Sequence, residues 1–287
     1  MVQKLIIISY NIKMRRNEKY TIFGHTGFLG KNIINFLKKD KIEYFLPQRK
    51  KLRFSHNLGH IIYCIGVYNV LDEPIKSIDA SLKILSSIIL ENKFTSFTLI
   101  SSTRLYLNSK KTNESDKICI NPNNKDYFFN SLRLTAENFC LSRNNKRIKV
   151  VRISNLYGNF FEKQKYFLPN LIRNSIKKKS INLKINKNSK KNYLDVVNAI
   201  EIILKIIKTG KYRLYNIASN KRYSLDFISR IIQKQTKCKI KYINQKAIYN
   251  EPIINIDRIK KEFNFRSNNN FKESLIKIII SKKSKRN

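Results

Sequence analysis

Three of the chain's seven glycines fall within seven consecutive residues, in the segment GHTGFLG from residue 24 to residue 30. Glycine suits places where the main chain must approach another group closely, because a side chain would occupy that space. The apolar segment 19–23 predicts a strand before this loop, and the periodicity of residues 28–39 predicts an amphipathic helix after it. Such a loop offers main-chain N–H groups and the positive end of a helix dipole to an anion, which fits the pyrophosphate of a dinucleotide. The residues predicted to bind the cofactor here are Gly24, Thr26, Gly27, Phe28, Leu29 and Gly30.

Positive charge follows the second predicted strand. Segment 43–46 predicts a short strand that runs into PQRKK, where Arg49, Lys50 and Lys51 stand without a carboxylate. An acidic residue in this region would bind the ribose 2′-hydroxyl of NAD, whereas a basic residue suits the 2′-phosphate of NADP. Arg49 is therefore a predicted cofactor residue, and the sequence favours NADP, with NAD as the alternative.

The elements that must position these residues alternate between strand and helix from residue 19 to residue 217. Further strands are expected at 60–65, 97–101, 148–154 and 212–217, and further helices at 77–91, 129–142 and 196–208. This alternation is typical of a parallel sheet covered on both faces. The predicted fold class is α/β, a Rossmann-type doubly wound parallel sheet with a smaller C-terminal substrate lobe.

The expected domain organisation follows from where the alternation holds. Residues 1–18 form an N-terminal extension, and residues 19–158 form the NAD(P)-binding domain, to which 192–217 return. Segments 159–191 and 218–280 fit the alternation less well and are expected to build the substrate lobe. Residues 281–287 are a basic tail.

Seven segments in order resemble the extended branch of the short-chain dehydrogenase/reductase superfamily, the NAD-dependent epimerase/dehydratase family. They are GHTGFLG, IYCIG, LISSTRLY, LRLTAENFC, VVRISNLYG, KKNYLDVVNAI and YRLYNIAS. The resemblance covers residues 19–278 and implies an NAD(P)-dependent enzyme that epimerises, dehydrates or reduces a nucleotide-activated sugar in cell-surface polysaccharide synthesis. It also implies that Cys64 and Gly66 lie beneath the adenosine and ribose of the cofactor, and that the protein forms a homodimer.

The resemblance assigns a catalytic group with one departure from the family pattern. The family's YxxxK pair corresponds to Phe129 and Arg133 when Glu137 is matched to the acid that follows the pair. The tyrosine exchanges a proton with the substrate oxygen, and the lysine lowers its pKa and binds the nicotinamide ribose. Phenylalanine has no proton to give, whereas Arg133 keeps the positive charge and remains a predicted cofactor residue. Tyr127 is the candidate acid if the helix begins later and the ring turns inward; another group, or loss of turnover, are the alternatives.

Four further residues are expected at the substrate. Ser102 corresponds to the hydroxyl that orients the sugar, and Thr103 follows it. Asn155 matches the asparagine of RxxNxYGP, which in the family contacts the nucleotide-sugar near its diphosphate. Lys191 takes the first place of the RDYxxVxDV motif and is assigned to the substrate as well.

Composition limits the function classes. No run of 18 or more apolar residues occurs, so no membrane partner is expected. The four cysteines are far apart without a CxxC pair and the three histidines form no cluster, so neither a disulfide nor a metal is expected and a cytoplasmic location is favoured. Lysine and arginine number 59 against 19 acids, a net charge of +40. That charge suits a nucleic acid, but the lysines are spread along the whole chain, as an AT-rich genome would produce, and nucleic acid is not the favoured partner.

Two functions therefore remain open from the sequence. The first is an enzyme of the epimerase, dehydratase or reductase type acting on a nucleotide-sugar. The second is an NAD(P)H-binding Rossmann protein without turnover, with a regulatory or nucleic-acid-binding role. The substitution at Phe129 discriminates between them, because the glycine loop is compatible with both.

Overall fold

The computed structural model describes residues 18–48, 50–67, 69–161, 164–245, 247–267 and 270–284. Its strands are β1 (Tyr20–Phe23), β2 (Tyr44–Phe45), β3 (His60–Tyr63), β4 (Ser96–Ser102), β5 (Ile148–Ile153), β6 (Asn155–Tyr157), β7 (Ser180–Leu183), β8 (Lys190–Asp195), β9 (Leu214–Ile217), β10 (Arg222–Ser224) and β11 (Lys239–Tyr242). Its α-helices are α1 (Phe28–Lys39), α2 (Pro74–Ile78), α3 (Ile84–Glu91), α4 (Phe128–Leu141), α5 (Phe167–Lys177), α6 (Val196–Thr209), α7 (Leu225–Thr236), α8 (Asp257–Phe263) and α9 (Phe271–Ser284). A π-helical turn over Asp79–Lys83 joins α2 to α3, and 3₁₀ turns cover Thr103–Tyr106 and Lys125–Tyr127. Within the described ranges, no helix is both long enough and apolar enough to cross a bilayer.

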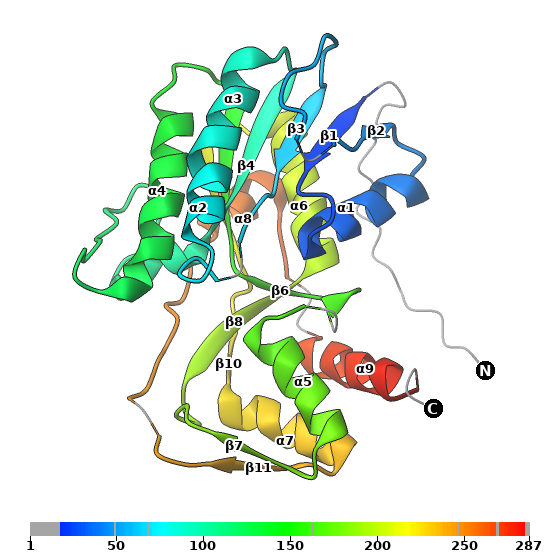
Figure 1. Ribbon diagram of the computed structural model, residues 1–287, viewed down its shortest axis with the longest axis vertical. Helices are drawn as coiled ribbons and strands as arrows, with labels where there is room; N and C mark the ends of the chain where they lie inside the picture. The colour runs from blue at the N-terminus through cyan, green and yellow to red at the C-terminus, as the bar shows by residue number, and fades with distance from the viewer. Residues whose placement is uncertain are drawn as a thin grey trace.

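A six-stranded parallel sheet forms the larger body, in the order β2-β1-β3-β4-β5-β9 (Figure 1). The chain enters at β1, passes to β2 at one edge, and then crosses back to β3 on the other side of β1. Ligands of doubly wound sheets bind beyond the carboxyl ends of the strands, at such a reversal of direction. The sheet confirms the predicted α/β fold class.

Helices cover both faces of this sheet because alternate side chains of each strand point to opposite faces. On β3, Ile61 and Tyr63 belong to a core shared with α3 and α4, where Leu85 and Cys140 are buried. Ile62 lies between them in sequence and belongs to the other core, with α1 and α6. Figure 1 shows these two helical layers on either side of the strands.

The smaller body holds a three-stranded sheet, β10-β8-β6, and a two-stranded sheet, β11-β7, with α5, α7 and α9 packed near them (Figure 1). Segments 159–191 and 218–280 supply most of these elements. The exception within 218–280 is α8, which packs against β9 and α6 beside the larger sheet. The last helix, α9, continues through Ser284, so the first four residues of the expected basic tail are helical.

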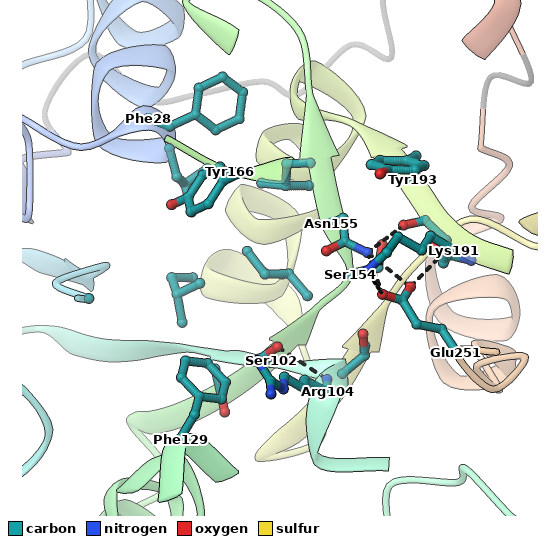
Figure 2. Close-up of a pocket in the computed structure, with 18 of the residues that line it drawn as sticks. Phe28, Ser102, Arg104, Phe129, Ser154, Asn155, Tyr166, Lys191, Tyr193 and Glu251 are labelled. Carbon is teal, nitrogen blue, oxygen red and sulfur yellow. Dashed lines mark hydrogen bonds and ion pairs between the residues drawn. The ribbon is translucent and has the colours of Figure 1, made fainter. Parts of the chain in front are cut away.

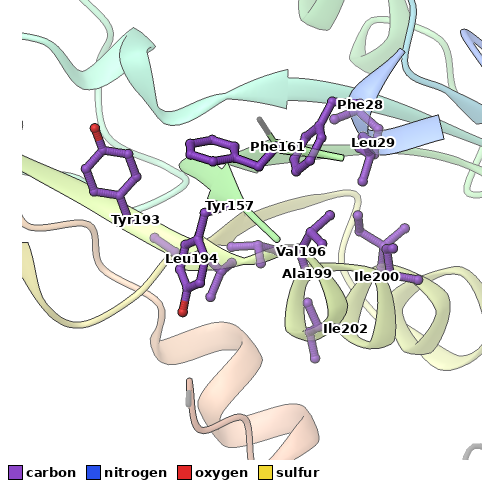
Figure 3. Packing of buried hydrophobic residues seen from close by; sticks show 14 of the residues in the cluster. Phe28, Leu29, Tyr157, Phe161, Tyr193, Leu194, Val196, Ala199, Ile200 and Ile202 are labelled. Carbon is purple, nitrogen blue, oxygen red and sulfur yellow. The ribbon is translucent and has the colours of Figure 1, made fainter. Parts of the chain in front are cut away.

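Apolar side chains join the two bodies (Figure 3). The ring of Phe28, at the start of α1, lies 5.9 Å from the ring of Phe161, which follows β6. Tyr157 and Tyr193, on β6 and β8, both contact the ring of Phe271 at the start of α9. These contacts belong to one continuous core. The contact between Phe28 and Phe161 fixes the smaller body against the glycine loop.

A buried ion pair fixes α4 relative to β5 near the carboxyl end of that strand. Arg152 donates from Nη2 to Glu137 Oε2 at 2.6 Å, and both side chains are at most 4% exposed. Arg152 also donates from Nη1 to the hydroxyl of Tyr106, which in turn donates to Asn216. Removing one member of such a network leaves a buried charge without compensation, so the network holds these elements in one relative position.

Candidate active site

Two of the three glycines of the loop are required by packing. Gly24 has φ +91°, and a Cβ there would lie 2.7 Å from the carbonyl carbon of Cys64. A Cβ on Gly30 would overlap the carbonyl oxygen of Gly24 and lie 2.6 Å from the Cα of His25. These two glycines therefore let β1, β3 and α1 pack closely, and neither lines the cavity described below.

Gly27 is different because only one atom lies close to the place that its Cβ would take. It is the N-cap of α1, with φ −75° and ψ 175°, and a Cβ there would meet only the carbonyl oxygen of Gly24, at 3.2 Å. No side chain caps the helix by accepting a hydrogen bond from the main-chain N–H groups of its first turn. A helix start of this kind attracts negative charge. Gly27, Phe28 and Leu29, which the sequence assigns to the cofactor, line the cavity.

The cavity has a volume of about 500 Å³ and follows the carboxyl ends of β3, β4 and β5 (Figure 2). Its walls come from both bodies, since α1 and α4 contribute on one side and α5 and β8 on the other. The structure brings ten of the predicted site residues to this one space. They are Gly27, Phe28, Leu29, Cys64, Gly66, Ser102, Thr103, Arg133, Asn155 and Lys191.

Four predicted residues are not brought there, besides Arg49, which lies outside the described residues. Gly24, Gly30 and the exposed Thr26 belong to the glycine loop but do not line the cavity. Tyr127 is 7% exposed, and its hydroxyl accepts a hydrogen bond from Asn108 Nδ2 at 2.9 Å. Because α4 begins at Phe128, Tyr127 is the residue before the helix and its ring packs inside the protein, away from the cavity wall.

Ser102 ends β4 with its hydroxyl at the cavity. Its Oγ accepts a hydrogen bond from the main-chain N–H of Arg104 at 3.1 Å (Figure 2). That bond uses a lone pair, so the hydroxyl proton of Ser102 stays available for a ligand. Thr103, the next residue, is 8% exposed and also lines the cavity.

Phe129 and Arg133 share the face of α4 that lines the cavity. The Phe129 ring has two guanidinium groups near it, those of Arg104 and Arg133, each with its Cζ 5.3 Å from the ring centroid. Arg133 reaches Gly66, where an added Cβ would lie 2.8 Å from its Nη2. Burial lowers the pKa of Arg133, and the negative charges that Tyr63, Tyr166 and Glu137 can carry oppose that shift. The wall therefore holds a positive charge next to a ring without a hydroxyl.

Cys64 lines the cavity after β3 but is not suited to nucleophilic chemistry. Its Sγ donates to the carbonyl oxygen of Phe23 at 3.1 Å. Burial raises the pKa of the Cys64 thiol to about 12, so the thiol stays protonated at neutral pH.

Two buried hydroxyls in the cavity wall have no hydrogen-bond partner among the described residues. Ser101, on β4, is 4% exposed, and Ser154, directly after β5, is 6% exposed. A buried polar group without a partner costs about 1–3 kcal/mol, which a ligand with a matching group would recover. Both hydroxyls lie at the carboxyl edge of the sheet, so this edge is the polar floor of the cavity.

The end of the cavity where the sequence predicts the substrate is built from β6, β8 and a loop after β11. Asn155 Nδ2 donates to the carbonyl oxygen of Asn192 at 2.8 Å and to both carboxylate oxygens of Glu251, at 3.0 and 2.9 Å. Lys191 Nζ lies 3.6 Å from Glu251 Oε1 and 5.2 Å from the centre of the Tyr249 ring. Figure 2 shows this cluster across the cavity from Phe28.

The sequence analysis missed Glu251, Tyr166, Ser154 and Arg104, all of which line the cavity. Ser154 and Arg104 adjoin Asn155 and Thr103, so the motifs already pointed to their neighbourhood. Glu251 lies 96 residues after Asn155, with no motif to connect the two. The one available signal was that acidic residues are scarce in this chain, which has 19 of them against 59 basic residues.

The Rossmann-type sheet carries a glycine loop at its reversal point, and a second lobe covers its carboxyl edge. This arrangement is typical of proteins that combine a dinucleotide-binding fold with a separate second lobe. The sequence profile of the NAD dependent epimerase/dehydratase family matches residues 75–218, half of the chain. The protein belongs to this family, which confirms the resemblance drawn from its motifs. A search of curated proteins finds no match.

Solved structures share the fold at low identity. UDP-N-acetylglucosamine 4-epimerase from Bacillus cereus is 19% identical, with a TM-score of 0.74 over 92% of this chain and 96% of its own. RMD from Pseudomonas aeruginosa, solved with NADPH, is 16% identical, with a TM-score of 0.74 over 93% and 98%. dTDP-glucose 4,6-dehydratase from Bacillus anthracis, solved with NAD, is 16% identical, with a TM-score of 0.73 over 94% and 97%. These matches extend the fold to nearly the full length of the chain.

Proposed function

We propose that this protein is an enzyme that binds NADP or NAD and acts on a nucleotide-activated sugar, by epimerisation, dehydration or reduction. The observation that carries the proposal is the position of Gly27, whose missing side chain opens the start of α1 onto the cavity. The structural neighbours support it, since RMD was solved with NADPH, the dehydratase was solved with NAD, and the epimerase and the dehydratase are named for nucleotide-sugars. We place the enzyme in the cytoplasm, as a homodimer, in cell-surface polysaccharide synthesis.

The residues present fit a dinucleotide. The space beside Gly27 would be filled by any larger side chain, and the space beside Gly66 is so narrow that Arg133 would touch a Cβ there. The first turn of α1 would hold the pyrophosphate through its N–H groups, and Arg133 would hold the nicotinamide end. When bound, the nicotinamide supplies hydride transfer to or from a carbon of the sugar.

The remaining groups would hold the sugar. Ser102 donates its free hydroxyl proton to a sugar oxygen, and Ser154 offers a hydroxyl that has no partner among the described residues. Arg133 keeps a positive charge close to the oxygen that gains or loses a proton, which stabilises negative charge there. Asn155 and Lys191 line the far end, where the rest of the nucleotide-sugar extends.

Cofactor choice gives a direct test of the proposal. Lys50 and Lys51 are exposed just beyond β2, so we expect NADPH to bind at least about tenfold more tightly than NADH, because a 2′-phosphate adds negative charge opposite these lysines. Titrating the protein with each cofactor and following nicotinamide fluorescence measures both affinities. Lys50→Glu combined with Lys51→Glu should weaken NADPH alone. If neither cofactor binds, the proposed function is wrong; if NADH binds more tightly, the preference for NADP is wrong.

A second candidate function follows from Phe129. A protein that binds NAD(P)H without turnover needs the glycine loop but not a proton-transferring hydroxyl on α4, and the ring at this position has none. Such a protein would have a regulatory or nucleic-acid-binding role. It would bind the cofactor and show no reaction with any nucleotide-sugar.

A further inference from the structure

Glu251 places a negative charge in a cavity whose other charged residues are positive. The remaining charged side chains among the described lining residues are Arg104, Arg133 and Lys191. Glu251 lies at the end of the cavity where the sequence predicts the substrate, in the cluster labelled in Figure 2. A carboxylate there needs a reason, because the proposed substrate carries a negatively charged diphosphate.

The main chain holds Glu251 firmly in place. Its N–H donates to the carbonyl oxygen of Lys190 at 3.0 Å, which ties it to the start of β8. Its carbonyl oxygen accepts a hydrogen bond from Arg222 Nη1, on β10, at 2.7 Å. Contacts from two neighbouring strands therefore fix the position of the residue, and its side chain is 19% exposed.

The carboxylate takes the donors that a diphosphate would use. Both of its oxygens accept from Asn155 Nδ2, and Oε2 also accepts from the main-chain N–H of Asn192 at 2.8 Å. The ammonium of Lys191 lies 3.6 Å from Oε1. Phosphate oxygens and carboxylate oxygens seek the same N–H donors and repel one another at close range. Glu251 thus offsets the charge of Lys191 and occupies the amide of Asn155.

We propose that Glu251 is a specificity-determining residue that lowers the affinity of the substrate end for a nucleoside diphosphate by holding Asn155 and Lys191 on its own carboxylate. The inference rests on the proposed function, since it presumes that a nucleotide-sugar enters this cavity. The residue discriminates by charge: a neutral group with hydroxyls meets hydrogen-bond acceptors at this end, whereas a phosphate meets a like charge.

The test is Glu251→Gln, which keeps the shape and one acceptor oxygen but removes the charge. Calorimetric titration at low ionic strength compares UDP, dTDP and GDP, each with its nucleoside. We expect the variant to bind the matching diphosphate at least about tenfold more tightly than the native protein, with the nucleoside changed about twofold or less. The gain should shrink as salt is added, because salt screens the repulsion. Unchanged or weaker diphosphate binding would overturn the inference.

Matched variants separate charge from other effects. Glu251→Asp keeps the charge and should bring no gain. Glu262→Gln makes the same charge change at a carboxylate that accepts from the N–H of Lys211 and the hydroxyl of Tyr215 outside the cavity, and it should leave diphosphate affinity unchanged. A gain in either variant would contradict the assignment to Glu251.

The proposed function can fail separately from this inference. If the native protein binds a diphosphate and Glu251→Gln binds it no better, the inference alone fails. If neither protein binds any of the three diphosphates, the proposed substrate class fails and the inference fails with it. NADPH affinity, measured on the same samples, should be equal in both proteins and shows that the variant is folded.

Discussion

Gly27→Asp should reduce NADPH affinity at least about a hundredfold while costing the protein about 1 kcal/mol of stability or less. The new carboxylate would stand at the start of α1, where the pyrophosphate is expected. Two like charges about 4 Å apart repel by about 4 kcal/mol at an effective dielectric constant of about 20. The fold should accept it with a small shift, because φ −75° and ψ 175° suit any residue and the one close atom is the carbonyl oxygen of Gly24, 3.2 Å from the added Cβ. Aspartate is also a better N-cap than glycine, by a few tenths of a kcal/mol. Calorimetry with NADPH and thermal unfolding of the same sample measure both effects.

Gly30→Ala is the matched control for this prediction. Its Cβ would overlap the carbonyl oxygen of Gly24, inside the loop and away from the cavity, so the protein should lose roughly 2–3 kcal/mol of stability. The two glycines, three residues apart, therefore have opposite signatures: one substitution removes binding and the other removes stability. Native NADPH affinity in Gly27→Asp would contradict the assignment of the loop to the cofactor.

Phe129→Tyr should raise turnover of a nucleotide-sugar by about 10²- to 10⁴-fold, the usual contribution of a positioned acid–base group. Position 129 lines the cavity, and the guanidinium of Arg133 lies 5.3 Å from the ring. A phenol there would face a positive charge, which lowers its pKa and eases proton transfer. The measurement is the rate of product formation from UDP-, dTDP- and GDP-sugars with NADP or NAD, in the native and variant proteins. No change in rate would show that the reaction does not use a hydroxyl at this position.

Tyr127→Phe is the companion variant. The Tyr127 hydroxyl accepts a hydrogen bond from Asn108, and Tyr127 does not line the cavity, so removal of the hydroxyl should cost about 1 kcal/mol of stability and leave the rate within about twofold. A complete loss of activity would instead indicate that Tyr127 is the catalytic acid, the role that the sequence analysis left open for it.

Local patterns were enough to predict the sheet and much of the cavity. Strands such as 60–63 and 148–153 are short segments rich in isoleucine and valine, and each ends in residues that must reach the carboxyl edge of a parallel sheet. Ser102 and Asn155 could therefore be placed from sequence, because their position depends on one strand each. The position of the glycine cluster, between a strand and a helix, could be predicted for the same reason.

What escaped prediction depends on contacts between distant segments or on a boundary of one residue. The role of Tyr127 depends on whether α4 begins at residue 128 or a few residues later, and sequence patterns do not fix a helix start that closely. Glu251 meets Asn155 only because the loop after β11 returns across β8, a contact that no spacing encodes. The Tyr63 hydroxyl donates a hydrogen bond to the carbonyl oxygen of Ala80 in the π-helical turn at 79–83. This tertiary contact likewise leaves no local pattern in the sequence.

The central claim is that the dinucleotide lies along the carboxyl edge of the sheet, from Gly27 to Arg133. A crystal structure of the protein soaked with NADPH tests it most directly. If the dinucleotide lies there, density for the pyrophosphate will stand against the main-chain N–H groups of Phe28 and Leu29, and density for the nicotinamide will stand between Ser102 and Arg133. Density for the dinucleotide at any other surface, with this cavity left free, would contradict it.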